Sequence, residues 1–256
     1  MIFTDPLAMR ILGADAETAV RDAGNDPSRR RLRLFVAIRT RFAEDALATA
    51  VARRGVRQLV VLGAGLDTCA YRASFGEDLR IFEVDHPATQ AWKRQRLAEA
   101  SIPTPRALIF APLDFERESL ADGLAAAGFD PGQQTFFTWL GVVPYLTERA
   151  VFSTLGFIAG LPGGAHVVFD YGNPPTSSSG RDDYGAAHEA AAARVACLGE
   201  ALQSAFETDA LHAKLRAFGF REIEDLGPAS IRERYFARRA GPSPDRGGHI
   251  LRATTV

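Results

Sequence analysis

The sequence predicts an open α/β fold built on a mainly parallel β-sheet. Short apolar runs, typical of strands buried on both faces, alternate with helix-like stretches along most of the chain. One such run, 59–62, ends in a turn that contains Gly63 and Gly65, and the next, 79–84, ends at Asp85. A glycine turn after one strand and an acid at the tip of the next are typical of nucleotide sites at the carboxyl edge of such a sheet.

The first 55 residues are predicted to be helical. Asp26-Pro27-Ser28 is a helix-start signal, and apolar residues recur near helical spacing after it, at Leu32, Phe35, Val36, Ile38 and Phe42. With 256 residues and 46% apolar residues, the chain can bury an ample core. We therefore expect one domain, 1–256, in which a helical segment, 1–55, precedes an α/β core, 56–256.

The helices and strands of the α/β core, 56–256, are predicted from apolar runs, helix caps and turns. After the two strands named above we expect a helix over 88–100, which follows Pro87, and a strand over 107–113. A helix over 116–126 comes next. The turn Pro131-Gly132 then precedes a strand over 135–140. A helix starting at Thr147 and a strand over 165–169 follow. The C-terminal part is predicted to hold helices over 186–205, 209–218 (closed by Gly219) and 229–239, and strands over 220–226 and 249–254.

The polar, glycine-containing stretch 176–183 is predicted to be a mobile loop over the site, with outer bounds 174–185.

Composition excludes several classes of function. A net charge of −1 gives no reason to expect nucleic acid as a partner. No apolar run approaches membrane-spanning length, and the start of the chain lacks the pattern of a signal peptide. Cys69 and Cys197 make no disulfide framework, so a cytoplasmic location is expected, with Cys69 a small packing residue.

The residues of the glycine turn indicate which nucleotide would bind. A dinucleotide fingerprint needs a glycine where the chain has Thr68. Asp67 would repel the pyrophosphate of NAD or FAD, which sits on such a turn. S-adenosylmethionine carries a sulfonium and an ammonium group instead, so the residues favour it over a dinucleotide. A turn that binds no ligand is the other alternative.

Several motifs together resemble the leucine carboxyl methyltransferase family. They are GAGLDTCAYR (63–72), FEVDHP (82–87), WKRQRL (92–97), DPLAMRILG (5–13), RTRFAED (39–45) and LGVVPYLT (140–147). More narrowly, they resemble its bacterial branch of small-molecule O-methyltransferases, often described as polyketide-type. The resemblance runs from near the first residue to about Tyr171, and a weaker resemblance is found at 234–236. It implies S-adenosylmethionine as cofactor and a class I methyltransferase (Rossmann-like) fold with a helical N-terminal extension. The implied sheet is mostly parallel and seven-stranded, with the last strand antiparallel.

The resemblance also implies roles for individual residues. Arg39 would hold the methionine carboxylate of the cofactor, with Arg41 as the alternative, and Asp114-Phe115 would hold the adenine. From the residues alone, Arg39 can equally be a surface arginine and Asp114 the cap of helix 116–126. The whole cofactor set is Arg39, Gly63, Ala64, Gly65, Asp67, Arg72, Asp85, His86, Asp114, Phe115 and Leu140.

Leu140 is a departure from the family pattern. Many family members carry glutamate immediately before the following glycine, and leucine removes a polar contact beside the cofactor. This puts in doubt the protein-carboxyl substrate of the eukaryotic branch. Pro144 and Tyr145 are expected at the carboxyl end of strand 135–140, facing the reacting methyl group.

The predicted function is therefore O-methylation of a small-molecule carboxylate or hydroxyl acceptor, as in polyketide-type secondary metabolism, by a monomer or homodimer without a metal. A carboxylate is already ionised, whereas a phenol or alcohol benefits from a base. Candidate bases are Tyr145, Tyr171, His86 and His188, and no spacing singles one out. A dinucleotide oxidoreductase and a catalytically silent nucleotide-binding protein are the alternative functions.

Overall fold

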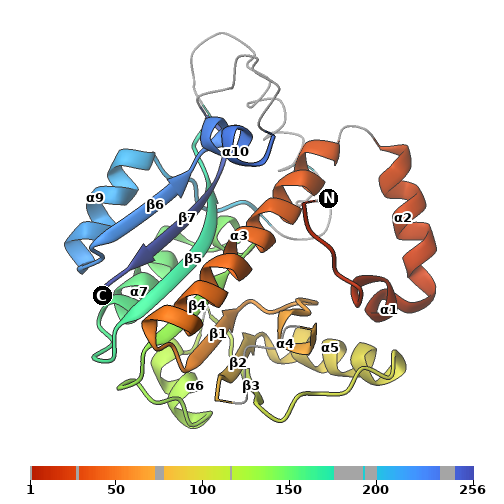
Figure 1. Cartoon of the computed structure of the whole chain (residues 1–256), viewed down its shortest axis with the longest axis horizontal. Helices are drawn as coiled ribbons and strands as arrows, with labels where there is room; N and C mark the ends of the chain where they lie inside the picture. Colours follow the sequence, from red (N-terminus) through yellow and green to blue (C-terminus); the bar gives the residue numbers. More distant parts are fainter. Residues whose placement is uncertain are drawn as a thin grey trace. The chain divides into compact units, whose positions relative to one another are not determined.

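The computed structural model describes residues 2–26, 29–72, 78–115, 117–175, 193, 201–236 and 246–256 (Figure 1). The chain forms two compact units, Met1–Thr138 and Trp139–Val256. The boundary between these units falls in the fourth strand.

The first unit contains the parallel part of the sheet. Its strands are β1 (Gln58–Leu62), β2 (Arg80–Asp85), β3 (Leu108–Pro112) and β4 (Thr135–Trp139), which ends one residue past the unit. They pair in parallel, with β2 next to β1 and β3, and β4 on the other side of β1. Every residue of β1 is buried, as its apolar run predicts for a central strand.

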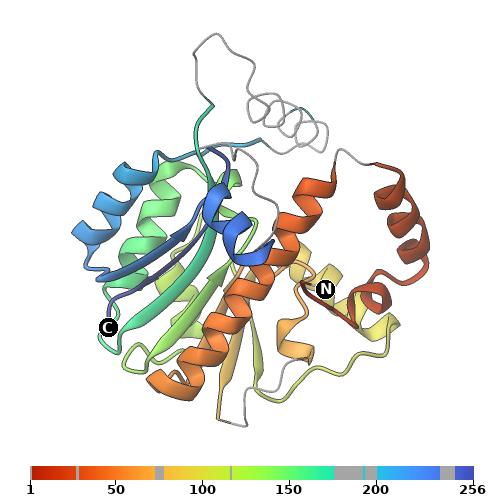
Figure 2. The same ribbon diagram turned by 45° about the horizontal axis from the view of Figure 1, so that its top comes forward.

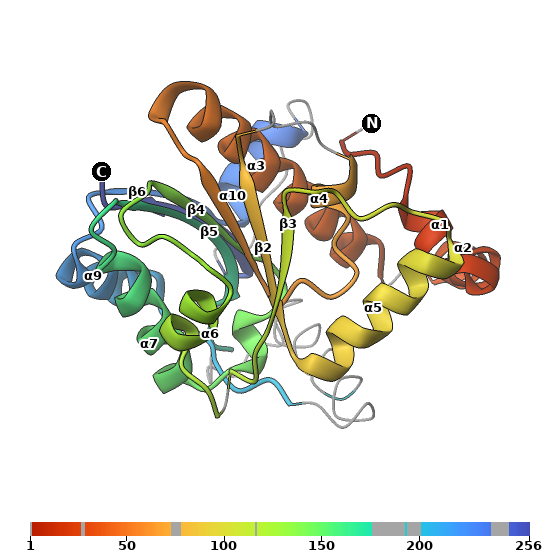
Figure 3. The same ribbon diagram turned by 90° about the horizontal axis from the view of Figure 1, so that it is seen from below.

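The helices of the first unit follow the predicted order. They are α1 (Ala8–Leu12), α2 (Ala16–Asn25), α3 (Arg30–Arg54), α4 (Cys69–Arg72), α5 (Pro87–Glu99) and α6 (Leu120–Ala126). The N-terminal segment is therefore helical over most of its length, and Gly55 ends α3 in the left-handed conformation. Helices α5 and α6 lie on opposite sides of strands β2 and β3 (Figure 3). Ile11 of α1 packs with Leu97 of α5 and with Ile102, which joins the N-terminal helices to this unit.

The second unit contains the antiparallel strands. Strand β7 (Gly248–Thr254) lies between β5 (Ala165–Gly172) and β6 (Glu222–Leu226) and is antiparallel to both (Figure 1). The helices are α7 (Glu148–Ala159), α9 (Thr208–Phe218) and α10 (Pro228–Tyr235), with a short 3-10 turn, η3, at Val143–Tyr145. Helices α7 and α9 lie side by side (Figure 2). The rings of Phe152 and Phe218 contact each other between them.

The seven strands have the hydrogen-bonded order β3-β2-β1-β4-β5-β7-β6. The predicted seven-stranded, mostly parallel sheet with an antiparallel last strand is therefore confirmed.

Two predicted helices differ from the structure. Helix α6 begins at Leu120 and not at residue 116, because the Ser119 hydroxyl accepts from the Asp122 N–H and caps it. The interpretation of Asp114 as this helix's cap is wrong. Residues 201–205, expected at the end of a helix over 186–205, are not helical. Instead, Gln203 and Ser204 hydrogen-bond to the backbone of η3.

Some predictions concern residues outside those that the structure describes. They are the loop over 176–185, the helix over 186–200 apart from Ala193, the end of the helix over 229–239, His188 and Cys197. Among the helices of the described residues, none combines the length and the apolar character needed to cross a membrane.

Candidate functional site

The glycine turn after β1 presents bare backbone. The N–H groups of Gly63 and Ala64 both donate to the carbonyl oxygen of Val84, at 2.8 and 3.2 Å, which fixes the start of the turn against β2. Gly63 and Gly65 have φ of 65° and 44°, in the left-handed region that glycine adopts most easily. A Cβ added to Gly65 would meet nothing closer than the Gly63 carbonyl oxygen at 4.0 Å. One face of the turn is therefore open to a ligand.

Asp85 lies beside this turn with both carboxylate oxygens already engaged. Oδ2 accepts from the Gly65 N–H at 2.5 Å, and Oδ1 accepts from the His86 N–H at 2.7 Å. Each oxygen keeps a further lone pair, so the carboxylate can still accept from two hydroxyl groups. The structure thus brings together the two features that the sequence singled out. Their arrangement fits the two hydroxyls of a ribose, and that role stays a prediction.

The segment after β3 lies next to the same acid. The Leu113 N–H donates to the carbonyl oxygen of Asp85 at 2.8 Å, so Asp114 and Phe115 follow directly at this edge of the sheet. Both residues are half-buried. His86 is exposed, and its Nδ1 accepts from the Ala88 N–H at 3.2 Å to cap α5.

Asp67 and Cys69 have local structural roles. Asp67 Oδ1 accepts from the Cys69 N–H at 2.7 Å at the start of α4. The Cys69 side chain is buried, and burial and the nearby Asp67 raise the pKa of its thiol well above the usual value. A thiol that resists ionisation is a poor nucleophile, which favours the packing role.

The structure separates Arg39 and Arg41, the two predicted partners for the cofactor carboxylate, and Arg72, a third arginine of the predicted cofactor site. Arg41 is exposed and pairs with Asp45 one turn along α3, at 2.7 Å. Arg72 is engaged with Glu44 of α3, at 3.0 Å, and its Nε donates to the Thr68 hydroxyl. Arg39 lies on the more buried side of α3, with the buried Ile38 and Phe42 as neighbours along the helix. This placement favours Arg39 for the carboxylate, and the role stays a prediction.

Arg39→Ala is expected to weaken S-adenosylhomocysteine binding by about tenfold or more, because a bidentate ionic contact is worth about 1.5–3 kcal/mol. Binding of 5′-methylthioadenosine, which lacks the carboxylate, should change little. Titration calorimetry with both ligands measures the difference. Arg41→Ala is the matched control from the same helix, and we expect it to leave both affinities unchanged. Equal loss of both ligands in Arg39→Ala would contradict a carboxylate contact.

The residues predicted near the acceptor belong to the second unit. Gly141, which follows Leu140, has a φ of 72°, and its N–H donates to Oδ1 of the buried Asp170 at 2.6 Å. Leu140 is half-buried. Tyr145 closes the η3 turn, and its carbonyl oxygen accepts from the Gln203 side chain at 2.7 Å. These contacts fix the backbone on either side of Val142-Val143-Pro144.

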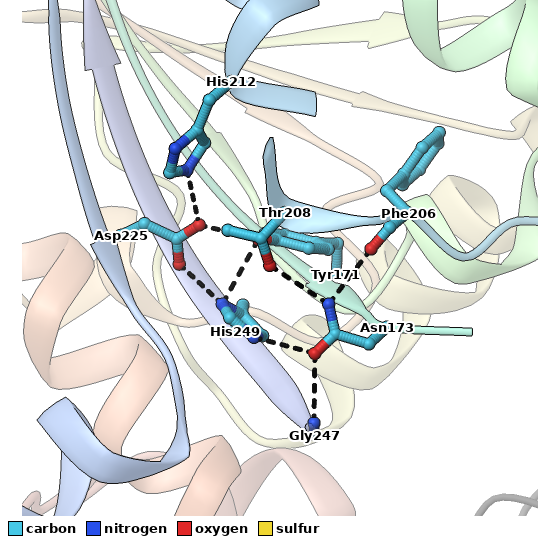
Figure 4. Close-up of polar contacts among 8 residues, drawn as sticks. All are labelled: Tyr171, Asn173, Phe206, Thr208, His212, Asp225, Gly247 and His249. Atoms are coloured by element: carbon cyan, nitrogen blue, oxygen red, sulfur yellow. Dashed lines mark hydrogen bonds and ion pairs between the residues drawn. The ribbon is translucent and has the colours of Figure 1, made fainter. Parts of the chain in front are cut away.

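Tyr171 is part of a buried polar network (Figure 4). Its side chain is 2% exposed, and its hydroxyl donates to Asp225 Oδ2 at 2.6 Å. Burial, together with Asp225, raises the pKa of Tyr171 far above the usual value. A phenol in this state is a poor proton acceptor, so the structure favours a structural role for Tyr171 over that of a base.

The remainder of this network was not predicted from the sequence. Asp225 of β6 also accepts from Nε2 of His212 and from Nδ1 of His249, both at 2.8 Å. Burial alone would raise the pKa of Asp225, but the hydrogen bonds from His249, Tyr171 and His212 hold it below the usual value. Figure 4 shows eight residues of this network: Tyr171, Asn173, Phe206, Thr208, His212, Asp225, Gly247 and His249.

The hydrogen bonds around Asn173 fix the position of His249. The Asn173 amide donates to the carbonyl oxygen of Phe206, and its Oδ1 accepts from the Gly247 N–H, so its orientation is determined. His249 Nε2 lies 3.0 Å from that Oδ1, and Nδ1 lies 2.8 Å from the Asp225 carboxylate. The imidazole ring therefore joins Asn173, which follows β5, to Asp225 of β6.

Solved structures define the class of fold. A crystal structure described as "a putative methyltransferase from Thermobifida fusca YX" matches with a TM-score of 0.58 at 17% identity, over 95% of this chain and 91% of that one. Magnesium protoporphyrin IX methyltransferase from Synechocystis PCC 6803, with bound SAH, matches with a TM-score of 0.50 at 11% identity, over 98% of this chain and 99% of that one. The chain has the fold of a class I methyltransferase.

Sequence comparison identifies the family. The model of the leucine carboxyl methyltransferase family matches residues 1–159, more than half of the chain. The chain therefore belongs to this family, as the motifs predicted.

Curated bacterial relatives carry a common name, "Putative S-adenosyl-L-methionine-dependent methyltransferase". YktD of Bacillus subtilis (strain 168) is 34% identical over 187 residues, which are 72% of this chain and 60% of that protein. A relative from Frankia alni is 37% identical over 166 residues, which are 62% of this chain and 57% of that protein. The chain thus spans less than two thirds of the length of these relatives.

Proposed function

We propose that this protein is an S-adenosylmethionine-dependent methyltransferase that methylates an oxygen of a small-molecule acceptor. The observation that carries the proposal is the Asp85 carboxylate, held by two backbone N–H groups beside the open glycine turn, in a chain of this family. NAD and FAD are disfavoured, because Asp67 places negative charge at the turn on which their pyrophosphate would lie.

The residues fit this cofactor by their chemistry. Asp85 would accept from the ribose hydroxyls, Arg39 would pair with the carboxylate, and the glycine turn leaves room for backbone contact. When bound, S-adenosylmethionine supplies an electrophilic methyl group on its sulfonium. The chain would contribute alignment of the acceptor and exclusion of water, which together are worth several kcal/mol.

We further propose that the acceptor oxygen belongs to a carboxylate. A carboxylate is ionised at neutral pH and needs no base, whereas an alcohol or phenol benefits from one. Tyr171 is unsuited to that role because its hydroxyl is committed to Asp225. A polyketide-type secondary metabolite and a cytoplasmic monomer or homodimer are part of the same proposal, which rests on the family branch that the motifs resemble.

Calorimetry with S-adenosylhomocysteine tests the proposal. We expect micromolar affinity, about −8 kcal/mol, and no binding of NAD. Tight NAD binding without S-adenosylhomocysteine binding would overturn the proposal in favour of an oxidoreductase.

A screen for release of S-adenosylhomocysteine with matched carboxylic acids, their esters and phenols then tests the acceptor. Turnover of the acids alone is expected. Cofactor binding without turnover of any acceptor would instead support a catalytically silent nucleotide-binding protein.

A further inference from the structure

A lysine is buried directly beneath the glycine turn. Lys93 of α5 has a side chain that is 1% exposed, and its ammonium contacts Glu83 of β2 at 2.9 Å, whose side chain is also 1% exposed. The same ammonium donates to the carbonyl oxygen of Asp67 at 2.7 Å and lies 5.2 Å from the centre of the Tyr71 ring. Fully buried lysines are rare, because removing an ammonium from water costs several kcal/mol.

Stability does not explain this arrangement. A buried ion pair can often be replaced by apolar side chains of similar volume with no loss of stability. The pair is also incompletely satisfied, because the buried Glu83 Oε1 has no hydrogen-bond partner among the residues that the structure describes. Burial, with the nearby Asp67, raises the pKa of Glu83 to about 7 even though Lys93 opposes the shift. The position of the lysine therefore calls for a reason other than packing.

The bond to Asp67 supplies that reason. The turn is anchored to β2 at its start, where Gly63 and Ala64 donate to Val84, and at Gly65, which donates to Asp85. Beyond Gly65, the Lys93 ammonium ties the turn to α5 by its hydrogen bond to the Asp67 carbonyl, and Leu66 packs against the apolar cluster that contains Leu97 of α5. Glu83 lies on the same strand as Asp85, so the ion pair also fixes α5 and the turn relative to the strand that carries the ribose acid.

We propose that Lys93 is a positioning residue for the cofactor: it pins the glycine turn at Asp67, so that the Gly65 backbone and Asp85 are held in their binding geometry. Glu83 acts by compensating the charge of Lys93. This inference rests on the proposed use of S-adenosylmethionine and adds a residue that would not touch the cofactor itself.

The test compares affinity with stability in two variants. Lys93→Met should weaken S-adenosylhomocysteine binding by at least about tenfold and lower the melting temperature, since it removes a charge-assisted hydrogen bond and leaves Glu83 unpaired. In the double variant Lys93→Met, Glu83→Met the buried carboxyl is gone, so the melting temperature should recover. The affinity should stay low, because the bond to Asp67 is still missing. Amide hydrogen exchange at Gly65 and Asp67 should be faster in both variants.

Gln90→Met is the matched control. Gln90 is a buried residue of the same helix whose side chain donates to the backbone of Glu83 at 3.1 Å, and within the described part of the chain it makes no hydrogen bond to the turn. We expect a lower melting temperature and unchanged affinity. If affinity recovers with stability in the double variant, Lys93 has a merely structural role and the inference is overturned. If the unaltered protein does not bind S-adenosylhomocysteine, the proposed function fails, and the exchange rates at Gly65 and Asp67 still decide whether Lys93 pins the turn.

Discussion

Asp85→Ala is expected to lower the affinity for S-adenosylhomocysteine by at least about tenfold. Charge-assisted hydrogen bonds to the ribose are worth about 1.5–3 kcal/mol, and each 1.4 kcal/mol is a factor of ten. The substitution also removes the acceptor of the Gly65 and His86 N–H groups, so the turn loses an anchor as well. Calorimetry gives the affinity, and thermal unfolding shows whether the fold survives.

A ligand that lacks the ribose hydroxyls tests whether Asp85 contacts them. The unaltered protein should bind the 2′,3′-dideoxy analogue of S-adenosylhomocysteine weakly, whereas Asp85→Ala should no longer distinguish the two ligands. Asp45→Ala is the control: the side chain of this exposed acid pairs with Arg41 on the surface of α3, and the affinity should not change. Unchanged affinity in Asp85→Ala would place the ribose contact elsewhere. Glu83, the other acid of β2, could not replace Asp85, because it is buried against Lys93.

The parts of the site that the sequence predicts are those with a local signal. Gly63, Gly65 and Asp85 stand at fixed points after two apolar strands, and adjacent parallel strands place such points at one edge of the sheet. Helix ends were predictable for the same reason. The Thr147 hydroxyl caps α7, and Gly219 ends α9 with a φ of 107°.

The parts that it does not predict depend on contacts between distant residues. Lys93 looks like an ordinary charged residue of a helix, and only the packing of α5 against β2 shows that its ammonium is buried. Asp225 comes close to His249 through the register of the antiparallel pair β6 and β7, in which Asp225 pairs with Leu251, two residues along β7 from His249. The start of α6 was misplaced because Asp114 and Ser119 are both good cap residues, and the choice between them depends on where β3 ends.

Asp225→Ala is expected to destabilise the fold by about 3 kcal/mol or more, because a buried donor left without an acceptor costs about 1–3 kcal/mol. The variant removes the acceptor shared by Tyr171, His212 and His249. Asp225→Asn should also lower the free energy of unfolding, because the NH2 group of the asparagine would face groups that donate hydrogen bonds to Asp225. Urea unfolding at neutral pH measures the free energy of unfolding of each variant.

The stabilisation by Asp225 should depend on pH. The pKa of Asp225 is lowered in the folded protein, so its stabilising effect should be complete above the unfolded pKa of about 3.9 and should be lost as the pH falls below it. This acid-induced loss should be smaller in Asp225→Ala.

Glu224, the adjacent residue of β6, pairs with Arg234 and Arg252 but is 35% exposed. Glu224→Ala should therefore cost no more than about 1 kcal/mol, since exposed ion pairs contribute little. Similar costs for the two variants would mean that the Asp225 network holds β5, β6 and β7 together no more strongly than a surface ion pair does.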